Sequence, residues 1–296
     1  MHSSEARVVA AYGRECLVRD ASGTEQRAVA RGKSETPVCN DLVTLHSDGD
    51  SAAIDAVLPR ERIFWRYDRR SGRRAVASHI DQLVVVLAGE PAADPWLIDR
   101  YLIAAQLENI DVLLVWTKSD LQAIDDSLLG VYQHIGYPVL AVSTQTGAGL
   151  DTLTERLQGK VSLVVGLSGV GKSSLINALV PVAEARTSAL STASGEGTHT
   201  TTGSRAYPLA EGALIDSPGV REYYLWPMPV EELARGYREI DAATHDCRFR
   251  NCVHRDEPGC GVKQALADGQ IDPQRYERFA RLSEGLARQH SDQAWR

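Results

Sequence analysis

The feature that most constrains this chain is a short glycine-rich run that ends in a lysine and two serines. Residues 166–174 read GLSGVGKSS, which matches the phosphate-binding pattern G-x-x-x-x-G-K-[ST]. The run follows the apolar stretch 161–165 and opens the helical pattern 173–179. In this context backbone N–H groups and a helix N-terminus cradle phosphates. The run therefore predicts an α/β nucleotide-binding domain, with a glycine-rich turn that holds no nucleotide as the alternative.

Each part of this P-loop has an expected chemical role. We expect Lys172 to reach the β- and γ-phosphates and the Ser173 hydroxyl to ligate Mg²⁺. The expected phosphate-binding residues are Gly166, Leu167, Ser168, Gly169, Val170, Gly171, Lys172, Ser173 and Ser174.

A second phosphate motif follows later in the chain. Asp216-Ser-Pro-Gly219 closes the short apolar stretch 213–215. As in the D-x-x-G motif of GTPases, Asp216 is expected to hold a magnesium-bound water, and the Gly219 N–H to sense the γ-phosphate. Such a tetrapeptide alone is a common turn. Its place after a P-loop and a threonine-rich segment makes it a GTPase signal.

The region between these two motifs is rich in threonine and poor in apolar residues. Residues 191–204 read STASGEGTHTTTGS and are expected to form a loop. Many GTPases have a water-orienting Gln directly after the D-x-x-G glycine, but Val220 stands here. We therefore expect slow intrinsic turnover, with His199 positioning water and Thr200 or Thr201 completing the magnesium shell. A solvated histidine without a catalytic role is the alternative.

A candidate base-reading motif ends the apolar stretch 112–116. It reads Thr117-Lys-Ser-Asp120, and the Asp120 carboxylate can accept hydrogen bonds from guanine N1–H and the exocyclic amine. Adenine does not offer that donor pair, so the motif favours GTP over ATP. Helix N-capping is the alternative role for the motif. The expected base-binding residues are Thr117, Lys118, Ser119, Asp120 and, as a helper element, Ser143 and Thr144.

The order of these motifs is unusual. In ordinary GTPases the P-loop comes first and the base reader follows the D-x-x-G motif, whereas here residues 117–120 and 143–144 precede residue 166. The sequence therefore predicts a circularly permuted GTPase domain, which a fold tolerates when its original termini lie close together. The expected strands are 83–87, 112–116, 139–142, 161–165 and 213–215, and the expected helices are 95–108, 150–158 and 173–179.

The segments before this domain differ from it in pattern and charge. Residues 7–58 alternate short apolar stretches with turn signals, which predicts a five-stranded barrel of the oligonucleotide-binding (OB) type with strands at 15–19, 42–46 and 52–58. A spacer role is the alternative for this barrel. Residues 60–74 hold seven arginines and two acidic residues, a net charge of +5 in a chain of net charge −7. The arginines and the interleaved aromatic residues indicate an RNA contact, and a solvated linker is the alternative.

Three of the five cysteines crowd into the segment after the GTPase motifs. The pattern C-x4-C-x-H-x5-C supplies Cys247, Cys252, His254 and Cys260. Three thiolates and one imidazole make a closed tetrahedral site, which is typical of structural zinc. Free reduced cysteines are the alternative.

Together these features resemble the ribosome small-subunit-dependent GTPase A family of bacteria. The resemblance implies a GTP hydrolase that binds the 30S ribosomal subunit and its 16S rRNA through the barrel and zinc domains, assists late maturation, and hydrolyses GTP faster on the ribosome. It covers residues 7–288, and its specific stretches are 58–60, 80–82, 169–174, 199–201, 216–219 and 257–260, besides the cysteine–histidine pattern.

The sequence departs from the family at a few positions. Thr117 stands where the family has Asn, whose amide ties the base loop to the P-loop, and Thr144 stands where the family has Ala. Cys39 and Asn40 replace a favoured glycine before Asp41. None of these changes removes a group that binds phosphate, although Thr117 predicts weaker guanine binding.

The expected organisation is therefore multidomain: an N-terminal OB-type β-barrel, a central α/β circularly permuted P-loop GTPase domain, and a C-terminal α-helical zinc-binding domain. The apolar runs are too short for a bilayer span, and residues 1–15 lack signal-peptide features, so we expect a cytoplasmic monomer that uses Mg²⁺ with GTP or GDP and one Zn²⁺. A guanine-nucleotide-regulated RNA-binding module with incidental hydrolysis is the alternative. The expected boundaries are 1–60 for the barrel, 61–78 for a basic linker, 79–226 for the GTPase domain and 227–296 for the zinc domain.

Overall fold

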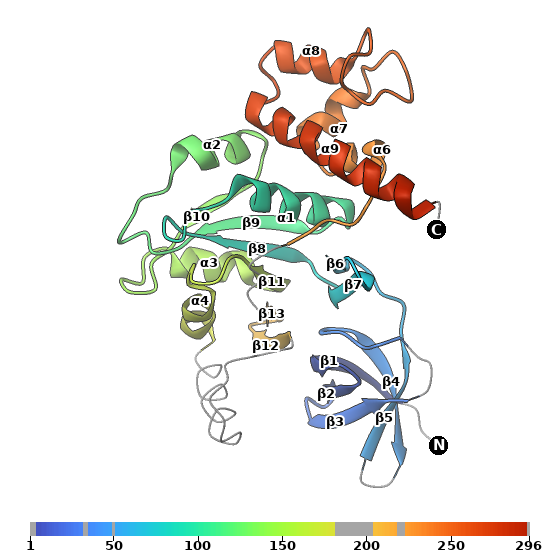
Figure 1. Ribbon diagram of the computed structural model, residues 1–296. Coiled ribbons are helices and arrows are strands. Elements are labelled where there is room, and N and C mark those ends of the chain that lie inside the picture. Colours follow the sequence, from blue (N-terminus) through green and yellow to red (C-terminus); the bar gives the residue numbers. More distant parts are fainter. Residues whose placement is uncertain (1–3, 32–34, 49–50, 181–203, 218–222, 295–296) are drawn as a thin grey trace.

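A computed structural model describes residues 4–31, 35–48, 51–180, 204–217 and 223–294 (Figure 1). The candidate catalytic residues His199, Thr200, Thr201 and Gly219 lie outside these ranges, as does Val220. Most of the expected loop at 191–204 lies outside them too.

The N-terminal unit is a closed five-stranded barrel, as predicted. Its strands are β1 (Ser4–Tyr12), β2 (Glu15–Asp20), β3 (Glu25–Ala30), β4 (Leu42–Asp48) and β5 (Ser51–Val57). They follow the order β1-β2-β3-β5-β4, and β4 returns to pair with β1, which closes the sheet and removes its edges. Alternate side chains such as Val8, Val18 and Ile54 point inward and fill the barrel.

The arginine-rich segment, expected as a basic linker, contains a β-hairpin that the sequence analysis did not predict. Strand β6 (Phe64–Asp68) pairs with β7 (Gly72–Ala77). The Asp68 carboxylate closes the turn by accepting hydrogen bonds from the N–H groups of Arg70 and Ser71, and Gly72 supplies a left-handed conformation. Figure 1 places the hairpin between the barrel and the central sheet.

The central sheet has the predicted permuted topology. Its strands are β8 (Gln82–Leu87), β9 (Asp111–Trp116), β10 (Val139–Ala141), β11 (Val161–Val165), β12 (Arg205–Leu209) and β13 (Gly212–Asp216), in the order β10-β9-β8-β11-β13-β12. Among these six strands all pairs are parallel except β12 with β13, and β12 also pairs antiparallel with β1 of the barrel. The P-loop strand β11 lies between β8 and β13, although β8 is the domain's first strand along the chain.

Helices cover both faces of this sheet (Figure 1). Helices α1 (Pro95–Leu107) and α2 (Asp126–His134) cover one face, and α3 (Leu150–Leu157) and α4 (Lys172–Leu179) cover the other. Strand β8 is buried throughout, with Leu83 and Val85 in the α1 core and Val84 and Val86 in the α3–α4 core. A strand buried on both faces explains why its sequence is continuously apolar.

The C-terminal part is helical and packs on the α1 face. It contains α6 (Val230–Arg235), α7 (Arg238–Thr244), α8 (Gly261–Ala267) and α9 (Pro273–Ala294). Its apolar residues, among them Tyr237 and Phe279, share one continuous core with α1. Among the helices that the structure describes, none is long and apolar enough to cross a lipid bilayer.

A buried ion cluster joins this C-terminal part to the GTPase fold. The Asp99 carboxylate on α1 is fully buried and accepts hydrogen bonds from Arg275 and Arg278 of α9, each at 2.6 Å, and from the Tyr132 hydroxyl at 2.8 Å. Arg275 also pairs with Glu239 of α7 at 2.5 Å. Two carboxylates and two guanidinium groups balance one another, as buried charges require.

Candidate functional site: a nucleotide site and a metal centre

The predicted nucleotide-binding motifs meet at one edge of the central sheet. Residues 117–120 follow β9, residues 143–144 follow β10, residues 166–171 follow β11, and Ser217 follows β13. These are the carboxyl ends of neighbouring parallel strands, which is where open α/β sheets bind ligands. The permuted order along the chain thus still assembles one site in space.

The P-loop has the backbone conformation that phosphate binding needs. Gly166, Gly169 and Gly171 all have positive φ values, of 147°, 87° and 96°. A Cβ on Gly166 would lie 2.4 Å from the Val86 carbonyl oxygen, so only glycine fits at this position. Helix α4 begins at Lys172 directly after the loop, and its first N–H groups therefore face the phosphate site.

Lys172 and Asp216 form the charged centre of the phosphate site. The buried Lys172 ammonium donates to the carbonyl oxygens of Gly166 at 2.9 Å and Leu167 at 2.6 Å. Burial lowers the pKa of Lys172, although Asp216 opposes this shift. Burial also raises the pKa of Asp216 to about 6, against the effect of Lys172. Neighbouring Ser217 donates to the Val164 carbonyl at 2.7 Å, which fixes the exit of β13.

These groups fit a hard divalent cation. The Ser173 hydroxyl is exposed at the start of α4, and the partly buried Asp216 carboxylate lies next to the P-loop lysine. Hydroxyl and carboxylate oxygens are ligands that Mg²⁺ prefers. The raised pKa of Asp216 fits a carboxylate whose negative charge is poorly solvated and would be stabilised by a cation.

The candidate base-reading residue Asp120 is held in place by Ser143 of the candidate helper element. The Ser143 hydroxyl donates to Asp120 Oδ1 at 2.5 Å and accepts hydrogen bonds from the N–H groups of Gln145 and Thr146, each at 3.2 Å. The Asp120 side chain is exposed at the site, and Ser143 behind it is buried. This arrangement leaves carboxylate oxygen free to accept hydrogen bonds from a guanine edge.

Two neighbouring side chains tie the base loop to the P-loop. The Lys118 ammonium donates to the carbonyl oxygens of Glu90 and Gly169, each at 2.8 Å. The buried Thr117 hydroxyl lies within hydrogen-bonding distance of the carbonyl oxygens of Leu87, at 3.0 Å, and Val170. A hydroxyl has only one proton, so Thr117 satisfies one of these carbonyls at a time.

The arginines of residues 60–74 divide into two groups in the structure. Three make ion pairs: Arg60 with Asp41 at 2.7 Å, Arg62 with Asp81 at 2.9 Å and Arg73 with Glu108 at 2.5 Å. Arg62 and Arg73 are nevertheless exposed, as are the other four, of which Arg66 and Arg74 lie directly opposite each other on β6 and β7. Like charges in that position repel each other. We call this group, Arg66, Arg69, Arg70 and Arg74, the outer arginines.

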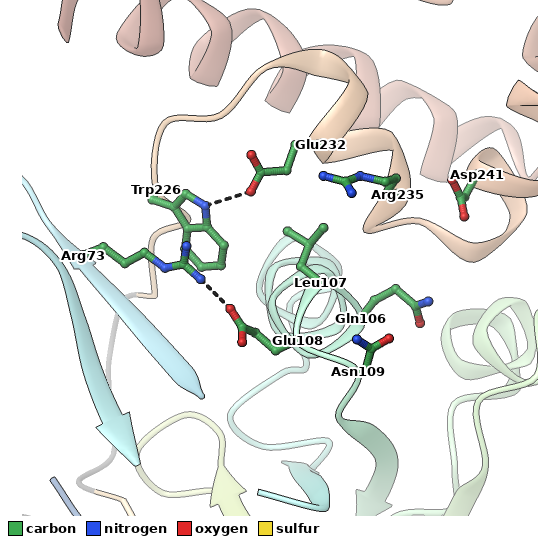
Figure 2. Close-up of a pocket in the computed structure, with 9 residues that line it drawn as sticks. All are labelled: Arg73, Gln106, Leu107, Glu108, Asn109, Trp226, Glu232, Arg235 and Asp241. Carbon is green, nitrogen blue, oxygen red and sulfur yellow. Dashed lines mark hydrogen bonds and ion pairs between the residues drawn. The ribbon is translucent and has the colours of Figure 1, made fainter. Parts of the chain in front are cut away.

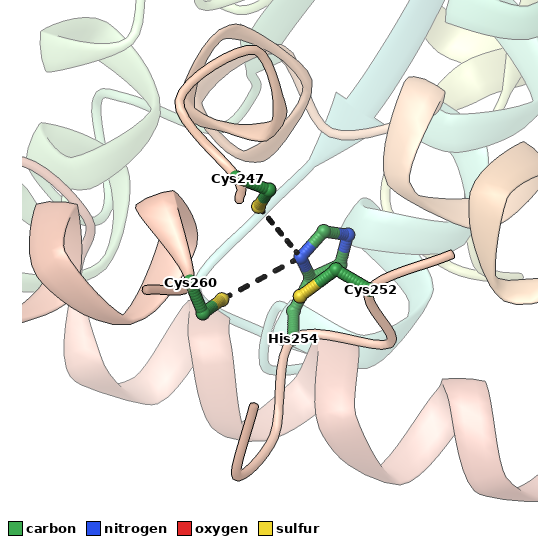
Figure 3. Close-up of side chains that lie close together, drawn as sticks. All are labelled: Cys247, Cys252, His254 and Cys260. Carbon is green, nitrogen blue, oxygen red and sulfur yellow. Dashed lines mark hydrogen bonds between the residues drawn. The ribbon is translucent and has the colours of Figure 1, made fainter. Parts of the chain in front are cut away.

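The cysteine–histidine pattern forms a compact cluster (Figure 3). One ligand atom from each of Cys247, Cys252, His254 and Cys260 lies within 4.8 Å of all the others. His254 Nδ1 lies 3.5 Å from Cys247 Sγ and 3.7 Å from Cys260 Sγ. Zinc bonds of ordinary length in a tetrahedron separate sulfur from nitrogen by about 3.6 Å. The cluster therefore fits a tetrahedral metal ion.

The loop around this cluster is built to hold it. Glu257 accepts hydrogen bonds from the N–H groups of Val253 and Arg255, each at 2.9 Å, and these bonds lower its pKa to about 2. Backbone N–H groups also point at the ligand sulfurs, from Gly261 to Cys247 at 3.3 Å and from Lys263 to Cys260 at 3.5 Å. Such donors stabilise thiolates, the form that binds metal.

Sequence reasoning missed the contacts that join the domains. A pocket of about 300 Å³ lies between the end of α1 and the C-terminal helices. Figure 2 shows the residues that line it. Its lining includes Arg73, which the sequence grouped with the other arginines, and Trp226, which follows the D-x-x-G motif. One available signal was Asp99, a charge within the apolar run of α1.

Comparison with known proteins places the chain in a family. The family model described as RsgA GTPase matches residues 57–226. A small ribosomal subunit biogenesis GTPase RsgA from Haemophilus influenzae is 38% identical over 297 residues, covering 96% of this chain and 86% of the relative. A protein of the same name from Alcanivorax borkumensis is 40% identical over 294 residues, covering 94% of this chain and 83% of the relative.

Solved structures agree with this placement. The crystal structure of YjeQ from Thermotoga maritima matches with a TM-score of 0.75 and 28% identity, covering 96% of this chain and 99% of that one. The structure of YloQ, a circularly permuted GTPase, matches with a TM-score of 0.72 and 25% identity, covering 97% and 96%. With the family model spanning the assembled phosphate and base sites, the chain belongs to the RsgA GTPase family.

Proposed function

We propose that this chain hydrolyses GTP on the small ribosomal subunit and assists the subunit's late maturation. The observation that carries the proposal is the match over nearly the whole chain to relatives named small ribosomal subunit biogenesis GTPase. The guanine site formed by Asp120 and Ser143 supports the nucleotide choice. We further propose that it acts as a monomer in the cytoplasm, binding the 30S subunit through 16S rRNA, with GTP and GDP as its nucleotides.

The side chains of the site have distinct tasks in this proposal. Asp120 selects guanine, and Lys118 and Thr117 hold the base loop against the P-loop. Lys172 stabilises the charge that develops on the γ-phosphate. Ser173 would ligate Mg²⁺ and Asp216 would hold a magnesium-bound water, and the cation would neutralise phosphate charge. His199, Thr200, Thr201 and Gly219 remain proposed contributors that lie outside the described residues.

The remaining proposed site residues follow the same division. Ser119 and Thr144 flank the guanine-binding groups, and Leu167, Ser168, Val170 and Ser174 contribute P-loop backbone N–H groups. Cys247, Cys252, His254 and Cys260 hold one structural Zn²⁺, which leaves no open coordination position for catalysis. We keep the proposed boundaries at 1–60, 61–78, 79–226 and 227–296, with the second segment built as a hairpin.

The outer arginines are the proposed contact with ribosomal RNA. They lie on the exposed face and the tip of the β6–β7 hairpin, and no ion pair joins Arg66, Arg69 or Arg70 to another described residue. Guanidinium groups bind phosphates in bidentate fashion, so RNA would relieve the repulsion between Arg66 and Arg74. The unfavourable Arg66–Arg74 pair on the surface therefore supports an anionic partner.

The decisive experiment measures GTP turnover with and without 30S subunits. We expect 30S subunits to raise kcat, and Lys172→Ala to abolish turnover while the protein still binds the subunit. A matched control is Lys160→Ala, because Lys160 is a half-exposed lysine that pairs only loosely with Asp111 at 3.8 Å, away from the site. Unchanged turnover in the presence of 30S subunits would contradict the proposal.

A second measurement separates catalysis from simple binding. If Lys172→Ala protein rescues ribosome maturation in cells as well as the unmodified protein, hydrolysis is incidental and the chain is a nucleotide-regulated RNA-binding module. We expect instead that docking persists and rescue is lost.

A further inference from the structure

Arg73 is the one arginine of the hairpin whose guanidinium contacts two aromatic rings, and its side chain is still about 35% exposed. Its Cζ lies 4.2 Å from the ring centroid of Trp65 and 3.9 Å from that of Trp226. Trp65 belongs to the hairpin, whereas Trp226 follows the D-x-x-G motif along the chain. Figure 2 shows Arg73 beside Trp226 and directed at Glu108. Cation–π contacts of this kind are stronger when the cation is partly desolvated.

Glu108 holds this stack on the end of α1. Its Oε1 accepts hydrogen bonds from Arg73 at 2.5 Å and from the Trp65 indole at 2.7 Å, and its Oε2 accepts one from the Ile63 N–H at 3.4 Å. The Trp226 indole donates to Glu232 of α6 at 3.3 Å. Arg73 thus contacts the hairpin, the end of α1 and the segment leading to the C-terminal helices.

The hairpin also contacts the segment after the D-x-x-G motif at Tyr223, three residues before Trp226. The Tyr223 hydroxyl donates to the Trp65 carbonyl oxygen at 2.5 Å. The Tyr223 ring stacks on Phe64 with centroids 5.4 Å apart and packs on Tyr101 at 4.8 Å. Residues 223–226 therefore cannot shift relative to the sheet without moving against the hairpin.

The outer arginines and the contacts of Arg73 lie on opposite faces of the hairpin. We call the contacts of Arg73 with Trp65, Trp226 and Glu108 the clamp. Arg66 and Arg74 lie opposite each other on one face, and Tyr67 and Arg73 lie opposite each other on the other. In a two-stranded ribbon, displacement of one face displaces the other, since the same backbone carries both. An anion that pulls on the outer arginines therefore acts on Arg73 and Trp65.

We propose that Arg73 is a positioning residue for GTP hydrolysis. It fixes the chain leaving the D-x-x-G motif against the hairpin, so that the nucleotide bound at the P-loop and an RNA bound by the outer arginines influence each other. This inference rests on the proposed function for the identity of the anionic partner. Linkage requires the effect to be reciprocal: RNA changes nucleotide affinity by the same factor by which nucleotide changes RNA affinity.

The first test needs no ribosome. Hydrogen exchange of residues 64–77 and 223–228 is measured on the full chain with GDP and with a non-hydrolysable GTP analogue, in Mg²⁺. We expect exchange in both segments to differ between the nucleotides by about fivefold, the lower end of typical coupling. Arg73→Met should remove the difference, and Arg73→Lys, which keeps a cation between the rings, should restore part of it.

A matched variant controls for simple loss of stability. Arg238 makes a comparable cation–π contact, 4.1 Å from the Tyr137 centroid, and a 2.9 Å hydrogen bond to Gln106 of α1. It contacts neither the hairpin nor residues 223–228 through these groups. Arg238→Met should leave the nucleotide-dependent exchange difference intact. Should Arg73→Met fail to fold, Trp226→Phe, which keeps an aromatic face, replaces it and should reduce the difference.

The second test uses 30S subunits. Arg73→Met should bind the subunit within about twofold of the unmodified protein but lose the increase in kcat, whereas Arg238→Met should keep it. Full stimulation in Arg73→Met, or equal exchange with both nucleotides in the unmodified protein, would overturn the role of Arg73. Failure of 30S subunits to stimulate the unmodified protein would instead contradict the proposed function. The hydrogen-exchange test would still show whether Arg73 couples the hairpin to residues 223–228.

Discussion

At the scale of single residues, we propose that Asp120 determines which base the site accepts. Its carboxylate, held by the Ser143 hydroxyl at 2.5 Å, is an acceptor for both guanine donors. Asp120→Asn turns one acceptor into a donor, so we expect GTP affinity to fall by about 10- to 100-fold, the loss of one charged hydrogen bond, and preference to shift toward xanthosine triphosphate. Competition binding checks this. Equal competition by ATP against GTP in the unmodified protein would refute the base assignment.

We expect His79, which follows the β6–β7 hairpin, to make the stability of the protein depend on pH. It has a left-handed backbone, with φ 53°, and burial, aided by nearby Arg7, lowers its pKa below the ordinary 6.5. The unfolded chain therefore takes up a proton at a higher pH than the folded chain, and stability falls as pH drops below about 6.5. In His79→Asn, which tolerates the same backbone, urea unfolding should lose part of this pH dependence. Parallel stability curves for the two proteins between pH 7.5 and 5.5 would contradict the assignment.

Residue types predicted the sites better than the contacts between them. The P-loop, Asp120 and the cysteine–histidine pattern are local signatures, because each places its groups within a few residues. The sequence also indicated that the Thr117 hydroxyl is the group of that side chain that can join the base loop to the P-loop, but it did not indicate the contact of Lys118 with the Gly169 carbonyl. The sequence did not predict the ion pair between Arg73 and Glu108, because the two residues lie 35 positions apart in the chain.

At the scale of elements, the loop that carries the cysteine–histidine cluster offers a direct test of metal binding. Cys252→Ser removes one thiolate from the cluster, and metal-binding free energy is folding free energy for such a loop. We expect loss of bound zinc by elemental analysis and a lower melting temperature of the C-terminal part. Cys16→Ala, which changes a buried cysteine of the barrel, should keep the zinc. Freshly purified protein without zinc, or unchanged melting in Cys252→Ser, would argue against the site.

The β6–β7 hairpin shows why an element was missed. Its strands alternate aromatic residues with arginines, and the sequence interpretation gave more weight to the charge than to the period of two. Helix α2 was also unpredicted, since it is short and relies on the Asp125 cap. Strands β8, β9 and β11 were predicted closely because burial on both faces makes them continuously apolar.

The outer arginines make a prediction for the hairpin as a whole. Replacing Arg66, Arg69, Arg70 and Arg74 with Gln should weaken binding to 30S subunits and flatten the dependence of log affinity on log salt by about 3, since each phosphate contact releases roughly one counterion. Binding is measured across a KCl series. The matched comparison is Arg62→Gln, whose parent side chain is paired with Asp81. An unchanged slope in the fourfold variant would mean that the hairpin does not contact RNA.

At the scale of the whole molecule, the sequence predicted the parts and their order but not how they dock. The permuted motif order predicted the sheet topology, and turn spacing predicted the barrel. The docking of the C-terminal helices on α1 depends on Asp99 and Arg275, which are separated by 176 positions. No local period reports such a pair, although a charge on the buried side of an apolar helix implies a distant partner.

We expect this ion cluster to determine how the GTPase domain and the C-terminal helical part unfold. Asp99→Asn leaves Arg275 and Arg278 buried at the joint without their shared carboxylate, and breaking a buried pair in this way costs about 3–5 kcal/mol. Because apolar contacts across the joint remain, we expect the variant to fold but to melt in two steps, with the C-terminal helices separating first. Calorimetry of the full chain would resolve the two transitions. Glu284→Gln, which removes an exposed ion pair between Arg255 and α9, should leave a single transition. A single unshifted transition in Asp99→Asn would mean that apolar packing alone joins the two parts.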